Sequence, residues 1–132
     1  MTKRLTILLA LVLAGAMIAG LAGCEQDSVT KNTAATLKAS KGTWEALQIQ
    51  AAKLYLAGKI TDAEWQQFVG IDRRFTATHN AAVEAFRIYL DAKDKDPQAT
   101  WAQHGLSVAM ENVWTVIREA QALIDAWSNR AE

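Results

Sequence analysis

The segment at residues 60–90 constrains the fold more than any other part of the chain. Thr61 and Glu64 have the spacing of a capping box, in which each side chain binds the other residue's backbone N–H at the start of a helix. Only a helix brings side chains with alternating spacings of three and four residues onto one face. The segment therefore predicts a helix over about 61–91, whose stripe carries Trp65, Phe68, Phe75, Ala82, Phe86 and Tyr89.

A helical pattern also lies on each side of this segment. The residues before it predict a helix over about 33–57, which ends where Gly58 can adopt a left-handed conformation. The residues after it predict a third helix over about 97–128, capped by Asp96, with Pro97 in the first turn, where its missing N–H costs nothing. The stripes of these two helices contain Leu37, Trp44, Leu47, Ala51 and Leu54, and then Leu106, Met110, Val113, Ile117, Ala120, Ile124 and Trp127.

Short connections make these helices antiparallel neighbours, so their stripes can be compared in register. The first connection places Trp44 opposite Phe75, and the second places Phe75 opposite Val113 and Trp65 opposite Ile124. Apolar side chains meet apolar or small ones through most of both pairings. The sequence therefore predicts an all-α fold, an antiparallel up-down-up three-helix bundle over residues 33–132.

The N-terminal residues have the composition of an export signal. Lys3 and Arg4 precede an apolar run at residues 5–23 in which Thr6 is the only polar side chain. A basic start followed by such a run is typical of a secretory signal peptide. An uncleaved transmembrane anchor is the alternative, because the run approaches the roughly 20 residues that span a bilayer. The three glycines of the run argue against that anchor, since they weaken a helix.

The apolar run stops at Cys24, the only cysteine of the chain. The sequence Leu21-Ala22-Gly23-Cys24 resembles the lipobox of bacterial lipoproteins. That resemblance implies cleavage before Cys24, a diacylglyceryl group on its thiol and an acylated amino terminus. Residues 1–23 would then be a signal peptide, and residues 24–32 the lipidated cysteine and a flexible tether, because they are polar and lack periodicity. In such lipoproteins an Asp directly after the cysteine favours retention in the inner membrane. The residue at that position here is Glu25, so the resemblance implies the outer membrane, with the domain facing the periplasm.

The charge and the motifs of the mature chain argue against several functions. Removing Lys3 and Arg4 with the signal peptide leaves 12 of the 14 basic side chains against 14 acidic ones, which does not suggest a nucleic-acid partner. A lipidated Cys24 provides no thiol for a disulfide, a metal or a nucleophile. The sequence contains no Gly-rich phosphate loop or G-x-S-x-G motif. We therefore expect neither an enzyme nor a bound cofactor.

Two titratable residues, Asp72 and His79, lie on the central stripe one heptad apart. Their Cα atoms would lie about 10 Å apart at 1.5 Å rise per residue, too far for a direct acid–base pair. We interpret them as a structural polar layer with Ser40, which the register places beside His79, because buried polar groups need partners. The donor predicted near Asp72 is the side chain of Trp44, Trp114 or Arg118.

The remaining candidate residues are one histidine and two tryptophans. His104 and His79 are the only histidines, and the register separates them by some two turns, so no metal site is expected. Trp101 and Trp114 lie beside the stripe of the third helix. Exposed tryptophans favour binding surfaces, so these two form a possible interaction surface.

These features predict a lipid-anchored periplasmic lipoprotein whose bundle is a structural or protein-interaction module with an unidentified partner. One alternative is an assembly helper for an outer-membrane complex. In size, anchor and helix content the chain resembles the secretin pilotins, small lipoproteins that take an amphipathic helix of a partner into a groove. A second alternative is a carrier of lipid or another small apolar ligand, which would need a cavity between the helices.

The lipobox resemblance predicts that the sulfur of Cys24 carries the lipid, and this can be tested by substitution. Cys24→Ala removes the sulfur that would carry the diacylglyceryl group, so the variant should incorporate no palmitate, remain unprocessed and lose normal membrane attachment. Labelled palmitate and membrane fractionation measure these effects. Unchanged mobility and unchanged membrane retention of the variant would refute the lipoprotein interpretation.

Overall fold

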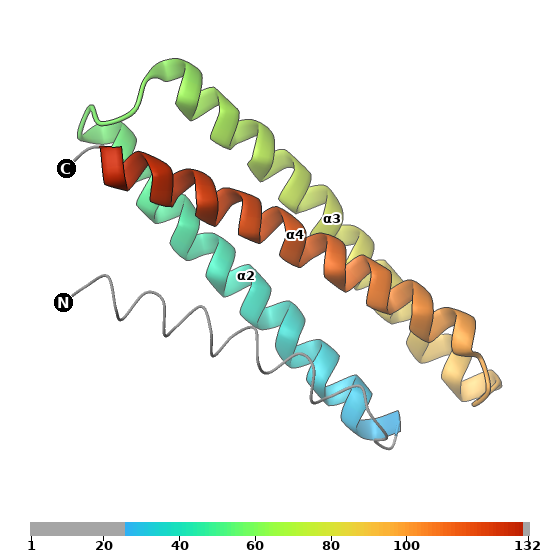
Figure 1. The fold of residues 1–132 in the computed structure, drawn as a ribbon. Helices are drawn as coiled ribbons and strands as arrows, with labels where there is room; N and C mark the ends of the chain where they lie inside the picture. The colour runs from blue at the N-terminus through green and yellow to red at the C-terminus, as the bar shows by residue number, and fades with distance from the viewer. Residues whose placement is uncertain (1–25, 131–132) are drawn as a thin grey trace. The chain divides into compact units, whose positions relative to one another are not determined.

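The computed structural model describes residues 26–130, and this range contains three helices: α2 (Gln26–Leu56), α3 (Asp62–Lys95) and α4 (Thr100–Arg130). The chain divides into two units, Met1–Ala35 and Thr36–Glu132. Within the second unit, residues 36–56 of α2 lie alongside α3 and α4, and helices that follow one another in the chain are antiparallel (Figure 1). The predicted all-α three-helix bundle is confirmed. Cys24 and the predicted signal peptide lie outside the described residues.

The helix α2 begins earlier than predicted. Residues 26–32, which we expected to form a flexible tether, are the first turns of this helix. Polar side chains alone do not stop a helix, and this segment contains neither Gly nor Pro. Adding residues to an existing helix is also far easier than nucleating one. None of the three described helices is long and apolar enough to cross a membrane.

The connection between α2 and α3 is the one that the sequence predicts. Gly58 has φ +68°, and the N–H groups of Gly58 and Lys59 donate to the carbonyls of Tyr55 and Leu54, both at 2.9 Å. These two bonds form the glycine-terminated helix end known as the Schellman motif. The capping box follows at once. The Thr61 N–H donates to Glu64 Oε2 at 2.8 Å, and the Glu64 N–H donates to the Thr61 hydroxyl at 3.2 Å.

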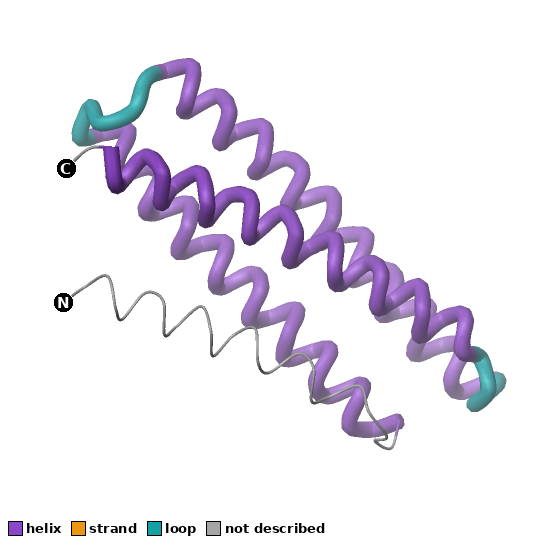
Figure 2. The backbone as a smooth tube through the Cα atoms, in the orientation of Figure 1, coloured by secondary structure: helices purple, strands orange, loops and turns teal. Residues whose placement is uncertain are grey.

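The second connection lies later in the chain than predicted (Figure 2). The helix α3 continues past Asp91 to Lys95, and the Lys95 ammonium donates to the Asp91 carboxylate at 2.9 Å. Asp96 is extended, with φ −145° and ψ 98°, because Pro97 disfavours the helical conformation in the residue before it. The Asp96 carboxylate accepts the N–H of Gln98 at 3.0 Å and so caps the turn, while α4 begins only at Thr100.

This later turn shifts α4 along α3. The turn moves by about one helical turn, so α3 residues meet α4 residues further along the chain than predicted. Glu64 accordingly pairs with Arg130 at 2.7 Å, although the predicted register placed its neighbour Trp65 opposite Ile124. The same face of α4 still meets the core, because Val113 and Ile117 of the predicted stripe are buried.

The core therefore contains most of the predicted side chains, although their partners changed. Leu54, Trp65, Phe86 and Met110 of the predicted stripes are only half-buried. Ile71, Trp114 and Val116 are buried although they lie outside those stripes, because a helix with two neighbours buries a face wider than one stripe. Among the buried apolar residues are Leu37, Trp44, Leu47, Ala51, Phe68, Phe75, Ala82, Tyr89, Leu106, Val113, Ile117, Ala120, Ile124 and Trp127.

The contact between the start of α3 and the end of α4 predicts a pH dependence. The Arg130 guanidinium, followed by the Thr61 N–H, lowers the pKa of Glu64 to about 2. In the unfolded chain this carboxyl titrates near its ordinary value of about 4.3, so its contribution to stability is present above that pH. That contribution should be lost as the pH falls from about 4.3 towards 2. Urea unfolding between pH 6 and pH 2 should show a smaller acid loss in Glu64→Gln than in the unmodified chain.

The matched variant for this prediction is Arg130→Met, which removes the largest cause of the lowered pKa. Like Glu64→Gln, it should lose less free energy of unfolding at low pH than the unmodified chain, and it should leave Thr61 and the capping box unchanged. Identical pH profiles for the unmodified chain and Glu64→Gln would contradict the prediction.

Candidate functional site: the groove between α2 and α3

A shallow groove of about 400 Å³ lies between the middle turns of α2 and α3, and we call it the α2–α3 groove. Its floor contains the rings of Trp44 and Phe75, which are 3% and 5% exposed. The side chain of Val83, which also lines the groove, is 46% exposed. The other lining residues are polar or charged: Lys41, Glu45, Gln48, Asp72, Thr76, His79 and Asn80.

A stack of aromatic rings forms the floor of the groove. Trp44 packs against Phe68 and Phe75, with ring centroids 5.7 and 4.3 Å away and interplanar angles of 2° and 6°. The two phenylalanines are one heptad apart on α3, so both present their rings to α2. The predicted pairing of Trp44 with Phe75 is confirmed. His79 continues the row, because its ring centroid lies 5.5 Å from that of Phe75.

Asp72 connects the two helices at this level. Its Oδ1 atom accepts the indole N–H of Trp44 and the side-chain N–H of Gln48, both at 2.7 Å. The prediction that Trp44 donates to Asp72 is confirmed, whereas Gln48 was missed. It lies four residues after Trp44, and therefore on the same face of α2, which is the signal that could have identified it.

The other two alternative donors, Arg118 and Trp114, do not bind Asp72. Arg118 donates to Glu111 at 2.6 Å and to Thr115 at 3.2 Å. The Nε1 atom of Trp114 is buried and has no hydrogen-bond partner within the described part of the chain. Of the three alternative donors, Trp44 is thus the one that binds Asp72.

Ser40 and His79 share an acceptor and do not bind each other. The Ser40 hydroxyl, which is fully buried, donates to the carbonyl oxygen of Leu37 at 2.8 Å. Atom Nε2 of His79 lies 3.4 Å from the same oxygen. A serine inside a helix commonly donates to a carbonyl of the preceding turn, which explains why its hydroxyl does not face across to His79. The predicted polar layer is thus two separate contacts, one at Asp72 and one at Leu37.

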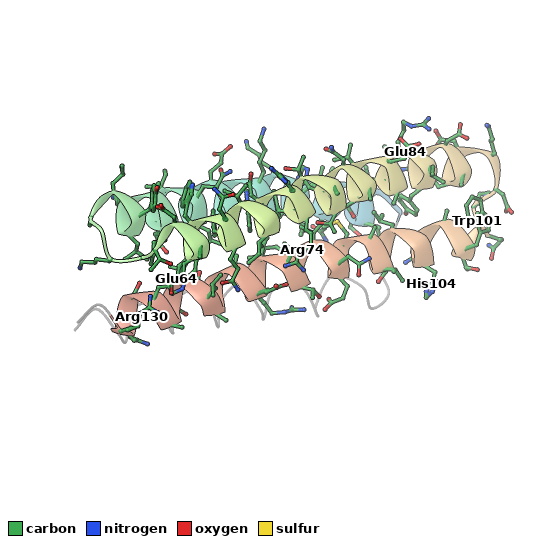
Figure 3. All side chains as sticks on the ribbon, turned by 90° about the horizontal axis from the view of Figure 1, so that it is seen from above. Glu64, Arg74, Glu84, Trp101, His104 and Arg130 are labelled. Carbon is green, nitrogen blue, oxygen red and sulfur yellow. The ribbon has the colours of Figure 1, made fainter. Side chains whose placement is uncertain are left out.

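The remaining predicted residues lie outside the groove. Trp114 is 8% exposed, so it belongs to the core and not to an interaction surface. Trp101 is 65% exposed, and His104 is exposed close to it on α4, at the end of the bundle that bears the α3–α4 turn (Figure 3). Within residues 26–130, no group of three His, Cys, Asp or Glu side chains is placed to hold a metal ion.

A second depression, of about 240 Å³, adjoins Trp101, and we call it the Trp101 hollow. Its apolar lining includes Ile88, which is 38% exposed. Charged side chains of both signs surround it, and some form ion pairs, such as Lys95 with Asp91 at 2.9 Å. The lining residues are Arg87, Ile88, Asp91, Ala92, Lys95, Asp96, Ala99 and Trp101.

The chemistry of the α2–α3 groove suits recognition. Its lining combines rigid aromatic surface with amides, hydroxyls and charges of both signs, which can contact an apolar side chain and bind polar groups around it. Asp72 has two donors from α2 on one oxygen, so its carboxylate is held in place at the seam of the two helices. No family model, curated protein or solved structure matches this chain.

The hydrogen bonds of Asp72 predict a contrast between two substitutions. Asp72→Ala leaves the Trp44 indole and the Gln48 amide without their acceptor, so the free energy of unfolding should fall by about 1 to 3 kcal/mol. His79→Leu replaces a half-buried polar ring with an apolar side chain and should leave the stability unchanged or higher. Urea unfolding followed by circular dichroism measures both. An Asp72→Ala variant as stable as the unmodified chain would show that these bonds contribute nothing.

Proposed function

We propose that this chain is a bacterial lipoprotein, held by lipid on Cys24 in the outer membrane, whose helical bundle binds a partner protein in the periplasm through the α2–α3 groove. The anchor follows from the lipobox and the apolar run before it. The observation that carries the binding role is the groove itself, where an aromatic floor is bordered by polar and charged side chains.

The groove has the chemistry that an amphipathic helix of a partner requires. Such a helix places apolar side chains every three or four residues against an apolar surface, which Trp44, Phe75 and Val83 provide here. Its flanking polar side chains would meet Lys41 and Glu45, which differ in charge. An assembly helper of the pilotin type is one form that this function can take.

The floor of the groove is rigid before any partner binds. Trp44 is stacked on both sides by phenylalanine rings, and its indole N–H is bonded to Asp72. A surface that is already ordered loses little conformational entropy on association, which favours binding. This property supports a recognition role for the groove.

The carrier alternative has less support from the core. A carrier needs an enclosed apolar cavity, whereas large side chains such as Leu47, Phe68 and Ile124 are at most 2% exposed and fill the space between the helices. The α2–α3 groove and the Trp101 hollow both open to the surface. A protein partner is therefore the better proposal.

Cross-linking in cells tests the groove with a matched control. A photoreactive benzoylphenylalanine replaces Thr76, an exposed groove residue, or Thr115, an exposed residue of α4 that does not line it. The two threonines are similar in backbone setting, because each hydroxyl donates to the carbonyl four residues earlier, at 3.1 and 2.9 Å; Thr115 also accepts a bond from Arg118. Irradiation should give a discrete protein adduct from position 76 and not from position 115.

Charge reversal on the border of the groove adds a second readout. Lys41→Glu should weaken the adduct from position 76, because it changes the charge presented to the partner without touching the aromatic floor. Equal adducts from positions 76 and 115, or no adduct from position 76 in a chain that is membrane-attached, would overturn binding through this groove.

A further inference from the structure

We propose that the end of the bundle bearing the α3–α4 turn contacts the surface of the bilayer, with Trp101 seated among the lipid headgroups. This inference rests on the lipid anchor of the proposed function and goes beyond it, because it assigns a second surface to the chain. The surface consists of Trp101 and the other residues of the Trp101 hollow.

The path of the chain gives the first argument. The Leu37 carbonyl lies opposite His79 of α3, and residues 36–56 run antiparallel to α3. Moving backwards along α2 from Leu37 therefore leads towards the C-terminal end of α3, where the turn lies. The chain that would carry the lipid thus enters the bundle from the direction of the turn.

The length of the intervening chain gives the second argument. Between His79 and Lys95, α3 advances about 24 Å, at 1.5 Å per residue. Between Gln26 and Leu37, α2 advances about 16 Å, and the two residues back to Cys24 add at most about 7 Å. Together they can span about the distance from His79 to Lys95. The opposite end, at Ile60, lies about 35 Å from Leu37 in the reverse direction, which is beyond this reach.

The chemistry of the Trp101 hollow gives the third argument. Tryptophan concentrates at the boundary between headgroups and acyl chains, because its ring is apolar and its N–H needs a polar partner. Trp101 is 65% exposed, and Ile88 beside it adds apolar surface. An isolated exposed tryptophan on a folded helix gains this environment when the end of the bundle meets the membrane.

The charges around the hollow select the kind of lipid. The basic side chains of the hollow are already paired, Lys95 with Asp91 at 2.9 Å and Arg87 with Glu84. Such pairs leave no excess positive charge to attract an anionic surface. A headgroup without net charge, which carries both an ammonium and a phosphate, suits this lining best. The occupant is therefore a phosphatidylethanolamine-type surface.

The opposite end of the bundle is the natural comparison. It exposes Leu56, which is 83% exposed, but no exposed tryptophan among the described residues. Gln98 and Lys59 are matched probe positions, since both are exposed loop residues, one beside each end. The thiol of Cys24 is blocked by lipid in the mature chain, so a cysteine introduced at either position is the only reactive one.

The experiment uses the full lipidated chain reconstituted into vesicles of phosphatidylethanolamine with a minor fraction of phosphatidylglycerol. A fluorophore is attached to Gln98→Cys or to Lys59→Cys, and quenching by headgroup spin-labelled lipid is measured. Quenching should be several-fold stronger at position 98 than at position 59. Adding Trp101→Ser should reduce quenching at position 98 and leave position 59 unchanged. Equal quenching at both positions, or stronger quenching at position 59, would overturn the inference.

Vesicle flotation separates failure of this inference from failure of the proposed anchor. A chain that carries no lipid and does not float with the vesicles refutes the anchor, and with it the inference. A chain that is lipidated and floats, but shows no quenching at position 98, refutes the membrane contact alone. A photoreactive residue at position 98 that links to a protein in cells, and not to lipid, would also overturn the proposal.

Discussion

The stack of Trp44 between Phe68 and Phe75 is the contact on which the arrangement of α2 and α3 depends. It places the ring of Trp44 within 6 Å of both phenylalanine rings of α3 and leaves each of the three side chains at most 5% exposed. The indole N–H must find an acceptor when the ring is buried, and Asp72 provides it from the opposite helix. A slip of one residue along the helix would turn either partner away from the other, so the same pair that stabilises the core also specifies its register.

This pair also couples the core to the surface. Asp72 is only half-buried and lines the α2–α3 groove, while Trp44, to which it is bonded, forms the floor. A groove built on core side chains is rigid, because its residues cannot move without disturbing the packing beneath. The polar contact at Leu37 is different in kind. There Ser40 and His79 approach one backbone oxygen, which satisfies that carbonyl without joining the two side chains.

The amount that could be predicted differs between the two helix connections. Gly58, Thr61 and Glu64 encode the first one locally, through a left-handed glycine and reciprocal side-chain caps, and the structure shows both features. The second lacks such a stop before Pro97, so the helix-compatible residues after Asp91 extended α3 by a further turn. Trp44 and Asp72 followed from the first register. The bond from Gln48 to Asp72 could have been predicted from the position of Gln48 on the same face of α2 as Trp44. The burial of Trp114 could not, because it depends on α4 packing against two helices at once.

The sequence by itself determined the middle of each described helix and which face of it is apolar, though not the helix ends, because both depend on spacings of three and four residues along one chain. The resemblance to a lipobox also comes from contiguous residues, and the lipid anchor that it implies stays a prediction. Only the tertiary structure decided which partners the polar side chains use. Glu64 pairs with Arg130 of α4, and His79 approaches a backbone carbonyl of another helix. These choices depend on the axial position of one helix against another, which a difference of a few residues in a turn changes while the apolar faces stay the same.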